Sequence, residues 1–447
     1  MNTLIRPRGI LPQYVINSII EEVLQNKNLP IKYIMSLLSI NKGVFKYISK
    51  YYYNTLRMGQ DKFTVEFMKI VETHIKNEYC PLKFIRKLVI GFSRDIPGNG
   101  KQLLPLTKTR FPHLTTLFLV LNRPIRQYKS IDTTFPTTIT DLTLDLRYDS
   151  GSTEYIVAIL ESVKPSIKSL SLFLKESEVP LYFSKTSLHG YLQSYQVGQL
   201  TKLYINTIDK LKEKVIFCNR YKTLTSLSLK DTELSLESIP KCENLQYLKI
   251  TCQERDIITL ITLINQKSSI RELVLTINQD YYLYYGIKTM EPFMFIMDLQ
   301  LIGHTNSIRK IINYNSKSSI LTSLSIIKRE YSLYDVIETI GTFLDKNTSL
   351  KNLVIDAIEH NILPDQILKS LSQSISKHPT LQSLTLGIEK QNDVVKTYLF
   401  DHLHQSKSLS VIKVKSTTYQ PGDSMKPKHP FVKIESLGNI TTYMPTK

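Results

Sequence analysis

Few residues of this chain combine the types and spacings that catalysis or metal binding requires. The segment IPGNGKQ holds the Gly–Lys pair of phosphate-binding loops, which need G-x-x-x-x-G-K-[ST] so that backbone amides surround a phosphate. Here Asp95 stands in place of the first glycine of that pattern, and Gln102 in place of the hydroxyl. His402 and His404 are two residues apart, and on a helix this spacing turns the two side chains away from each other. Neither segment therefore predicts a site.

The cysteines give no catalytic or metal-binding pattern either. Cys80, Cys218, Cys242 and Cys252 form no C-x-x-C pair, and the N-terminal stretch has no secretory signal pattern. They are expected to be reduced thiols packed in a core. No H-E-x-x-H or G-x-S-x-G motif occurs. The sequence accordingly predicts no enzyme activity, no metal site and no cofactor.

The charge of the chain is strongly positive but dispersed. The formal net charge of the 447 residues is +18, a balance that can signal a nucleic-acid or acidic-protein partner. The lysines are spread along the chain without a nucleic-acid-binding motif, so no nucleic-acid partner is expected. No uncharged apolar run approaches the roughly 20 residues that span a bilayer, so no membrane association is expected. The predicted compartment is the cytosol or nucleus.

The strongest pattern is a repeated apolar triplet with the spacing L-x-x-L-x-L. Thirteen copies occur, and their first positions run from 85 to 409, a mean interval of 27 residues. A single copy is weak evidence, but this number at a period of 20–29 residues is typical of a repeat fold. The copies are Ile85/Leu88/Ile90, Leu114/Leu117/Leu119, Ile139/Leu142/Leu144, Ile167/Leu170/Leu172, Leu200/Leu203/Ile205, Leu224/Leu227/Leu229, Leu245/Leu248/Ile250, Ile270/Leu273/Leu275, Ile296/Leu299/Leu301, Leu321/Leu324/Ile326, Leu350/Leu353/Ile355, Leu381/Leu384/Leu386 and Leu409/Ile412/Val414.

The spacing within each copy predicts a strand. The fourth and sixth positions are two residues apart, so both side chains point to one face of a strand. Several connecting segments carry apolar residues at helical spacing: 153–166, 256–269, 334–349 and 364–380. Each unit is therefore expected to be strand–loop–helix, and stacked units would bury a continuous core beneath a parallel sheet. The predicted fold class is α/β.

Residues 81–415 resemble leucine-rich repeat proteins with helices on the convex side. The resemblance implies a horseshoe-shaped solenoid of about 13 repeats with a concave parallel sheet. One feature departs from the family pattern. The family favours Asn at the ninth position of the repeat, where only Asn122 and Asn278 match.

Residues 1–58 have a different texture, with two apolar helical stretches separated by a break. This order, with Leu-Pro first and an apolar–Lys–aromatic stretch last, resembles an F-box. Phe45 stands where many members of that family have Trp, and this chain has no Trp. The alternative is that these helices only cap the open end of the first repeat, because any solenoid needs such a cap. The resemblance implies adaptor-binding residues at Leu11, Pro12, Ile16, Ile20, Leu38, Val44 and Phe45.

Two further segments complete the predicted domain organisation. Residues 59–80 carry apolar residues at helical spacing and predict a connecting helix. Residues 416–447 hold four prolines without a clear period and predict a flexible tail or a C-terminal cap.

The sequence therefore supports two hypotheses for function. In the first, the resemblances imply a non-catalytic substrate receptor of a cullin-type ubiquitin ligase. Its F-box would bind a Skp-family adaptor, and through it a cullin, while the repeats bind an unknown protein substrate. In the second, the chain is a leucine-rich repeat scaffold with no ubiquitin role.

A candidate partner surface lies on the sheet face opposite the core. Counted from the first residue of each L-x-x-L-x-L pattern, positions three, five and seven point to the opposite face of the strand from the leucines. Most of these positions hold small polar residues. Three consecutive central repeats instead carry lysines and tyrosines, which suit an acidic or phosphorylated segment, although an ordinary soluble sheet face is the alternative. The predicted partner-binding residues are Lys202, Tyr204, Asn206, Lys230, Tyr247 and Lys249, with Thr251 beside them.

Overall fold

The chain forms two compact units, which are described separately. Unit 1 comprises residues 1–192 and 197–200, and unit 2 comprises residues 193–196 and 201–447. A computed structural model describes these residues, to which all structural statements here refer: 13–25, 42–52, 54–58, 73–74, 76, 80–92, 111–121, 136–146, 159–174, 199–207, 221–233, 236–278, 291–303, 305–328, 334–358, 365–388, 403, 405–416, 431–437 and 440–445.

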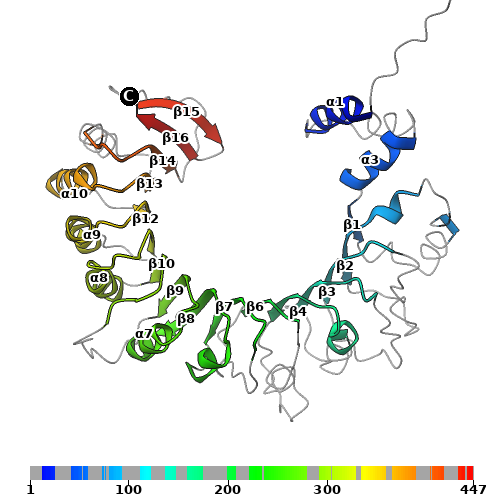
Figure 1. Ribbon diagram of the computed structural model, residues 1–447, viewed down its shortest axis with the longest axis horizontal. Coiled ribbons are helices and arrows are strands. Elements are labelled where there is room, and N and C mark those ends of the chain that lie inside the picture. The colour runs from blue at the N-terminus through cyan, green and yellow to red at the C-terminus, as the bar shows by residue number, and fades with distance from the viewer. Residues whose placement is uncertain are drawn as a thin grey trace, which may run out of the picture. The chain divides into compact units, whose positions relative to one another are not determined.

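Unit 1 is a parallel sheet preceded by two helices (Figure 1). Adjacent strands pair in chain order from β1 to β5. The short helix η2 comes between β1 and β2, and α1 and α3 precede β1. The elements are α1 (Gln13–Gln25), α3 (Lys42–Tyr52), β1 (Thr55–Met58), η2 (Pro81–Phe84), β2 (Lys87–Phe92), β3 (Thr116–Leu121), β4 (Asp141–Leu146) and β5 (Ser169–Leu174).

Unit 2 continues the same strand pattern and adds regular helices on one face of its sheet (Figure 1). Strands β6 to β14 pair in parallel, each with the next in sequence. The elements are β6 (Lys202–Thr207), β7 (Ser226–Glu233), η3 (Leu236–Lys241), β8 (Tyr247–Gln253), η4 (Glu254–Asp256), α7 (Ile257–Asn265), β9 (Glu272–Asn278), β10 (Asp298–Gly303), α8 (Thr305–Tyr314), β11 (Ser323–Lys328), α9 (Tyr334–Lys346), β12 (Asn352–Ile358), α10 (Asp365–Lys377), β13 (Ser383–Ile388), β14 (Val411–Ser416), β15 (Phe431–Leu437) and β16 (Ile440–Pro445).

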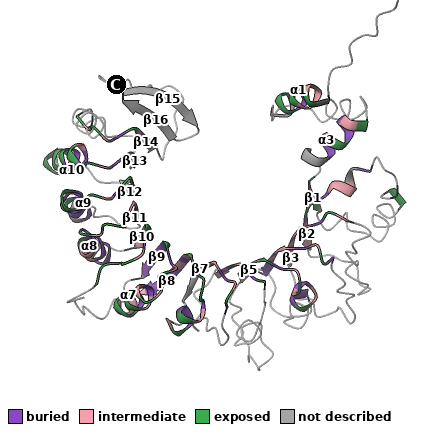
Figure 2. Cartoon of the chain, viewed as in Figure 1, coloured by how far each residue is buried: buried purple, intermediate pink, exposed green. Residues whose placement is uncertain are grey.

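The apolar triplets form the core of both units. Every residue of the thirteen predicted triplets is buried, and the buried positions follow the strands in Figure 2. Equivalent positions also pair in register, so that Leu227 lies opposite Leu248, which lies opposite Leu273. Burying a Leu or Ile side chain contributes about 1.5–3 kcal/mol to the free energy of folding, and each further repeat in the stack adds that contribution again. The predicted α/β class with a parallel sheet is confirmed.

Helices were predicted correctly where the connecting segment is long and periodic. α7, α9 and α10 lie within the predicted helical segments, and 159–163 is helical within 153–166. Their apolar residues are buried on one side, such as Ile337, Ile340 and Leu344 of α9. The connection between β7 and β8 is instead the 3-10 helix η3, in which Pro240 removes a backbone donor.

In each unit, strands outside the triplets extend the sheet of that unit. Residues 55–58, which fall within the predicted N-terminal domain, form β1, and Leu56 pairs with Leu88 of β2. In the predicted tail, β16 pairs antiparallel with β14, and β15 pairs antiparallel with β16. The predicted connecting helix falls mostly on residues outside those described, which include only 73–74, 76 and 80 of it.

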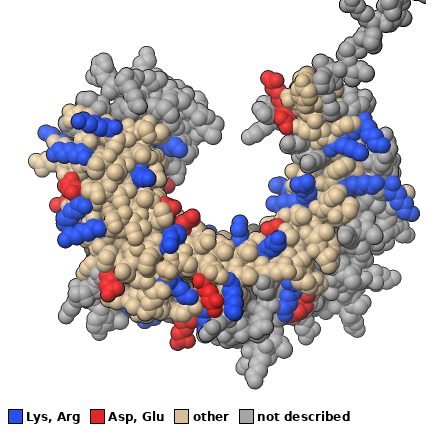
Figure 3. All heavy atoms as spheres, viewed as in Figure 1, with Lys and Arg blue, Asp and Glu red and all other residues tan. Residues whose placement is uncertain are grey.

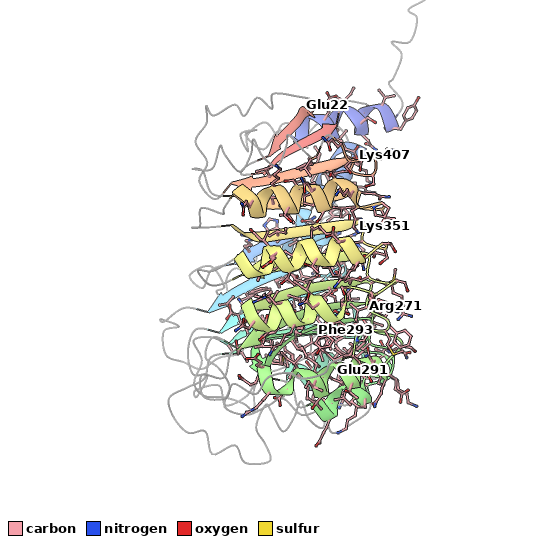
Figure 4. The ribbon with its side chains drawn as sticks, turned by 90° about the vertical axis from the view of Figure 1, so that its left-hand side faces the viewer. Glu22, Arg271, Glu291, Phe293, Lys351 and Lys407 are labelled. Carbon is pink, nitrogen blue, oxygen red and sulfur yellow. The ribbon has the colours of Figure 1, made fainter. Side chains whose placement is uncertain are left out.

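Hydroxyl side chains link successive repeats where the chain enters each strand. We call this border of unit 2 the turn edge, and Lys351 and Lys407 mark it in Figure 4. At Ser269, Ser349, Thr380 and Ser408 the residue directly before a triplet donates to a carbonyl of the preceding repeat. Ser349 Oγ lies 2.8 Å from the Leu321 oxygen, and Thr380 Oγ1 lies 2.9 Å from the Leu350 oxygen. These bonds fix the stacking distance between repeats.

The buried side chains of Asn347 and His378 also form hydrogen bonds at the turn edge. Asn347, only 1% exposed, donates from Nδ2 to the Ser318 oxygen at 2.8 Å. Its Oδ1 accepts from the backbone amides of Ser349 at 3.0 Å and Leu350 at 2.9 Å. His378 holds the equivalent place one repeat later, where its Nδ1 accepts from the Thr380 amide at 3.4 Å. The His378 Nε2 is buried without a hydrogen bond to a described atom.

Candidate functional site

The predicted partner-binding residues lie together on three neighbouring strands of unit 2. We call them the β6–β8 patch: Lys202, Tyr204 and Asn206 of β6, Lys230 of β7, and Tyr247 and Lys249 of β8. Each alternates with a buried core residue, because successive side chains of a strand point to opposite faces. Lys202 and Lys230 are exposed and the other four are half-buried. All six therefore contribute surface.

Strand register places two serines between the larger side chains. Lys202 pairs with Ser226, which pairs with Tyr247. In the next row, Tyr204 pairs with Ser228, which pairs with Lys249. A lysine and a tyrosine on β6 thus stand about 10 Å from a tyrosine and a lysine on β8, since strands are about 4.8 Å apart. The two hydroxyls of β7 lie between them.

A register shift separates Lys230 from the rest of β8. Lys230 pairs with Asn206 on β6, whereas the β7–β8 pairing shifts between Ser228 and Glu233. Thr251, expected beside the patch, consequently pairs with Glu233 and is buried. An extra stretch of residues in one strand produces such a shift and re-aims the side chains near it.

The electrostatic surroundings keep the tyrosine of β8 neutral. Burial raises the pKa of Tyr247, and the carboxylate of Glu272 on β9 raises it further. Tyr247 pairs directly with Glu272 in the sheet, which explains the second effect. At neutral pH Tyr247 is therefore a neutral phenol with a hydroxyl able to donate to a ligand, on the same strand face as Lys249.

Sequence reasoning missed the acidic neighbours of this patch. Glu272 pairs with Asp298 on β10, and both side chains are exposed on the same face as Tyr247. Each occupies position three of its triplet, so applying the same alternation to the next two repeats would have found them. The patch is thus bordered on one side by two carboxylates, which limits how far an acidic segment could extend over the sheet.

The N-terminal helices bury most of their described apolar residues within unit 1. Ile20, Val44, Phe45 and Ile48 form one buried cluster, with Phe84 of η2 packed against it. Of the predicted adaptor-binding residues, Ile20, Val44 and Phe45 belong to that cluster and Ile16 packs on it, whereas Leu11, Pro12 and Leu38 lie outside the described residues.

One side of α1 remains uncovered by described residues. Tyr14 is 72% exposed and Ile19 is 50% exposed. An apolar side chain as large as isoleucine is commonly buried, so its exposure marks the part of this helix available to a partner.

The residues first considered for catalysis or metal binding form no such site in the described part of the chain. Cys80, Cys242 and Cys252 are buried thiols that form no disulfide. Burial raises the pKa of Cys242 to about 12, although Lys267 lowers it, so that thiol stays protonated at neutral pH. Within the described ranges no three His, Cys, Asp or Glu side chains could hold a metal ion. Cys218, His402, His404 and the IPGNGKQ segment lie outside them.

Comparison with known proteins adds no family assignment. No protein-family model matches this chain, and no curated protein matches it. Among the described helices, none is long and apolar enough to cross a membrane. Figure 3 shows Lys and Arg side chains distributed over the visible surface rather than gathered in one region.

Proposed function

We propose that this chain is a non-catalytic protein-interaction module, a leucine-rich repeat solenoid of horseshoe type whose β6–β8 patch binds an acidic or phosphorylated protein segment. The observation that carries the proposal is the register of the patch. It places Lys202 and Tyr204 opposite Tyr247 and Lys249, with only serines between them. Rigid aromatic side chains supply contact area, and ammonium groups bind carboxylate or phosphate oxygens.

The register also predicts how the segment lies. The three lysines of the patch attract negative charge, whereas Glu272 on the next strand repels it. An acidic segment is therefore confined to β6–β8, and its negatively charged residues face Lys202, Lys230 and Lys249. A phosphorylated residue would gain more than Asp or Glu, because phosphate carries more charge and more acceptor oxygens.

The decisive experiment removes the aromatic surface without touching the core. Full-length tagged protein carrying Tyr204→Ala and Tyr247→Ala is compared with wild type for partner recovery from cells and for thermal stability. The matched control is Ser323→Ala with Ser325→Ala, which changes two residues of β11 on the same face, at positions three and five counted from Leu321. We expect the tyrosine variant to lose at least one partner that the serine variant retains. If the fold is intact and every partner is recovered as in wild type, the patch is not the binding site.

A second candidate function is that of substrate receptor in a cullin-type ubiquitin ligase. The exposed apolar residues Tyr14 and Ile19 on α1 favour it, because a helix that only caps a solenoid has no need of them. In this proposal α1 contacts a Skp-family adaptor, which carries the cullin. The buried cluster of Ile20, Val44 and Phe45 supports the shape of the domain rather than contacting the adaptor.

An adaptor pull-down tests the receptor proposal. Ile19→Glu changes an exposed residue, so it should leave the fold intact and abolish adaptor binding. Ser18→Ala on the same helix is the control, since Ser18 is exposed and donates only to the Tyr14 carbonyl. If wild-type protein binds no adaptor where known F-box proteins do, the receptor proposal fails. The N-terminal helices are then only a cap of the repeats, and the binding role of the β6–β8 patch is unaffected.

A further inference from the structure

The face of β1, β2 and β3 in unit 1 differs from the polar face expected from the sequence. Val89 of β2 pairs with Phe118 of β3, and Gly91 pairs with Val120 two residues further on. All four positions alternate with buried core leucines and isoleucines and are half-buried. Three apolar side chains therefore form three corners of a square on the sheet surface, and the fourth corner is a glycine.

The glycine leaves that corner open. A Cβ atom added at Gly91 would meet no heavy atom within 4 Å. Gly91 also has no left-handed backbone angle that would explain its presence. Glycine inside a strand weakens the strand, and it often marks a place where another molecule approaches closely. The open corner exposes the sides of Val89, Phe118 and Val120 to an incoming side chain.

Cations border the same square on one side. Arg57 of β1 pairs with Val89, and Lys87 precedes Val89 by two residues on β2. Arg57, Lys87 and the adjacent Arg86 are exposed, and no described carboxylate forms an ion pair with any of them. We call Arg57, Lys87, Val89, Gly91, Phe118 and Val120 the β1–β3 patch.

We propose that the β1–β3 patch is a docking surface for an acidic protein segment that carries an apolar side chain two residues from a carboxylate. The apolar side chain occupies the space above Gly91 against Val89, Phe118 and Val120. Diagonal neighbours in a sheet are about 7–8 Å apart, which is close to the distance between two same-side residues of an extended segment. The carboxylate then reaches the guanidinium of Arg57 or the ammonium group of Lys87.

This inference goes beyond the proposed function, because it concerns other strands and a different ligand. The β6–β8 patch offers tyrosines and lysines without an aliphatic contact surface. The β1–β3 patch requires an apolar anchor as well as negative charge, in the way that buried anchors surrounded by charged rims dominate other interfaces.

The probe is a fluorescein-labelled peptide of sequence SDSLSDSLSDS, in which each leucine has an aspartate two residues away in both chain directions. Binding to the full-length protein is measured by fluorescence anisotropy. Two control peptides replace both leucines by serine or all aspartates by asparagine. We expect the probe to bind about tenfold more tightly than either control, since each control lacks one of the two interactions.

Gly91→Val tests the site by filling it. Valine favours strands and its Cβ would meet no heavy atom within 4 Å, so the melting temperature should stay within about 2 °C of wild type. Probe affinity should fall about tenfold. Ser171→Val on β5 is the matched control, because it adds an apolar side chain at a half-buried position of the same face, three strands from β2. It should bind as wild type. Arg57→Gln with Lys87→Gln should reduce probe binding to that of the asparagine peptide.

Several results would overturn the proposal. Unchanged probe binding by Gly91→Val, or equal binding of the peptide without leucine, would exclude an apolar site at Gly91. If the same variants no longer bind a decathymidine oligonucleotide but still bind the probe peptide, the patch would be assigned to nucleic acid. If the wild-type protein sediments as a dimer and Gly91→Val converts it to a monomer, the patch would be assigned to a second copy of the chain. Probe binding lost only in Tyr204→Ala with Tyr247→Ala would leave the proposed function standing and refute this one.

Discussion

Asn347 is expected to stabilise the turn edge of unit 2 by holding two repeats together. Its side chain donates to the Ser318 oxygen at 2.8 Å and accepts from the Ser349 and Leu350 amides at 3.0 and 2.9 Å. Asn347→Ala removes these three bonds and the one that Oδ1 accepts from Ser349 Oγ at 3.3 Å, and it leaves the buried Leu350 amide without that acceptor. At about 0.5–1.5 kcal/mol for each bond, the free energy of unfolding should fall by about 2–4 kcal/mol.

The matched control is Asn313→Ala, the same chemical change at an exposed position of α8. It should alter stability by less than about 0.5 kcal/mol. The chain has no Trp, so unfolding in urea is followed by far-UV circular dichroism. Hydrogen exchange at Ser349 and Leu350 reports the local effect, because these amides donate to Asn347. Equal stability of the two variants, with unchanged exchange at both amides, would refute the role assigned to Asn347.

Three further predictions concern the core, a packing glycine and pH. Leu248→Asp places an unpaired charge in a fully buried column and should lower the free energy of unfolding by about 4 kcal/mol or more; a near-wild-type urea midpoint would contradict the assigned register. Gly387→Val should lower the melting temperature, unlike Gly91→Val, because its Cβ would lie 3.2 Å from the Asp356 Cα and meet the Asp356 carboxylate. Burial lowers the pKa of His378. The backbone carbonyl of Asn347 partly offsets this shift, although it accepts no hydrogen bond from the buried Nε2 atom. The unfolded chain therefore takes up the proton first, and stability should fall as pH drops below about 6.5. His378→Asn should remove that part of the pH dependence in urea titrations at several pH values; an unchanged slope would contradict it.

The repeat spacing by itself determined the core and the strand register. Leu224, Leu227 and Leu229 show why: a spacing of three then two places all three side chains on one side of a turn followed by a strand, whatever the neighbouring repeats contain. Stacking then requires equivalent positions to align, as Leu227 and Leu248 do. The same alternation identified the residues of the β6–β8 patch, since the face opposite the core follows from the core.

The tertiary structure decided features that no local pattern encodes. β1 belongs to none of the thirteen triplets, and it becomes a strand because β2 offers it an unpaired edge, where Leu56 pairs with Leu88. The shift between Ser228 and Glu233 depends on how β7 meets β8, so Thr251 is buried rather than displayed. The open corner at Gly91 likewise arises from side chains on two strands that are neighbours only in the folded sheet. The repeat spacing specifies which face a side chain takes and which positions align, whereas shifts such as that between β7 and β8, and the packing around each side chain, are fixed only when the strands pair.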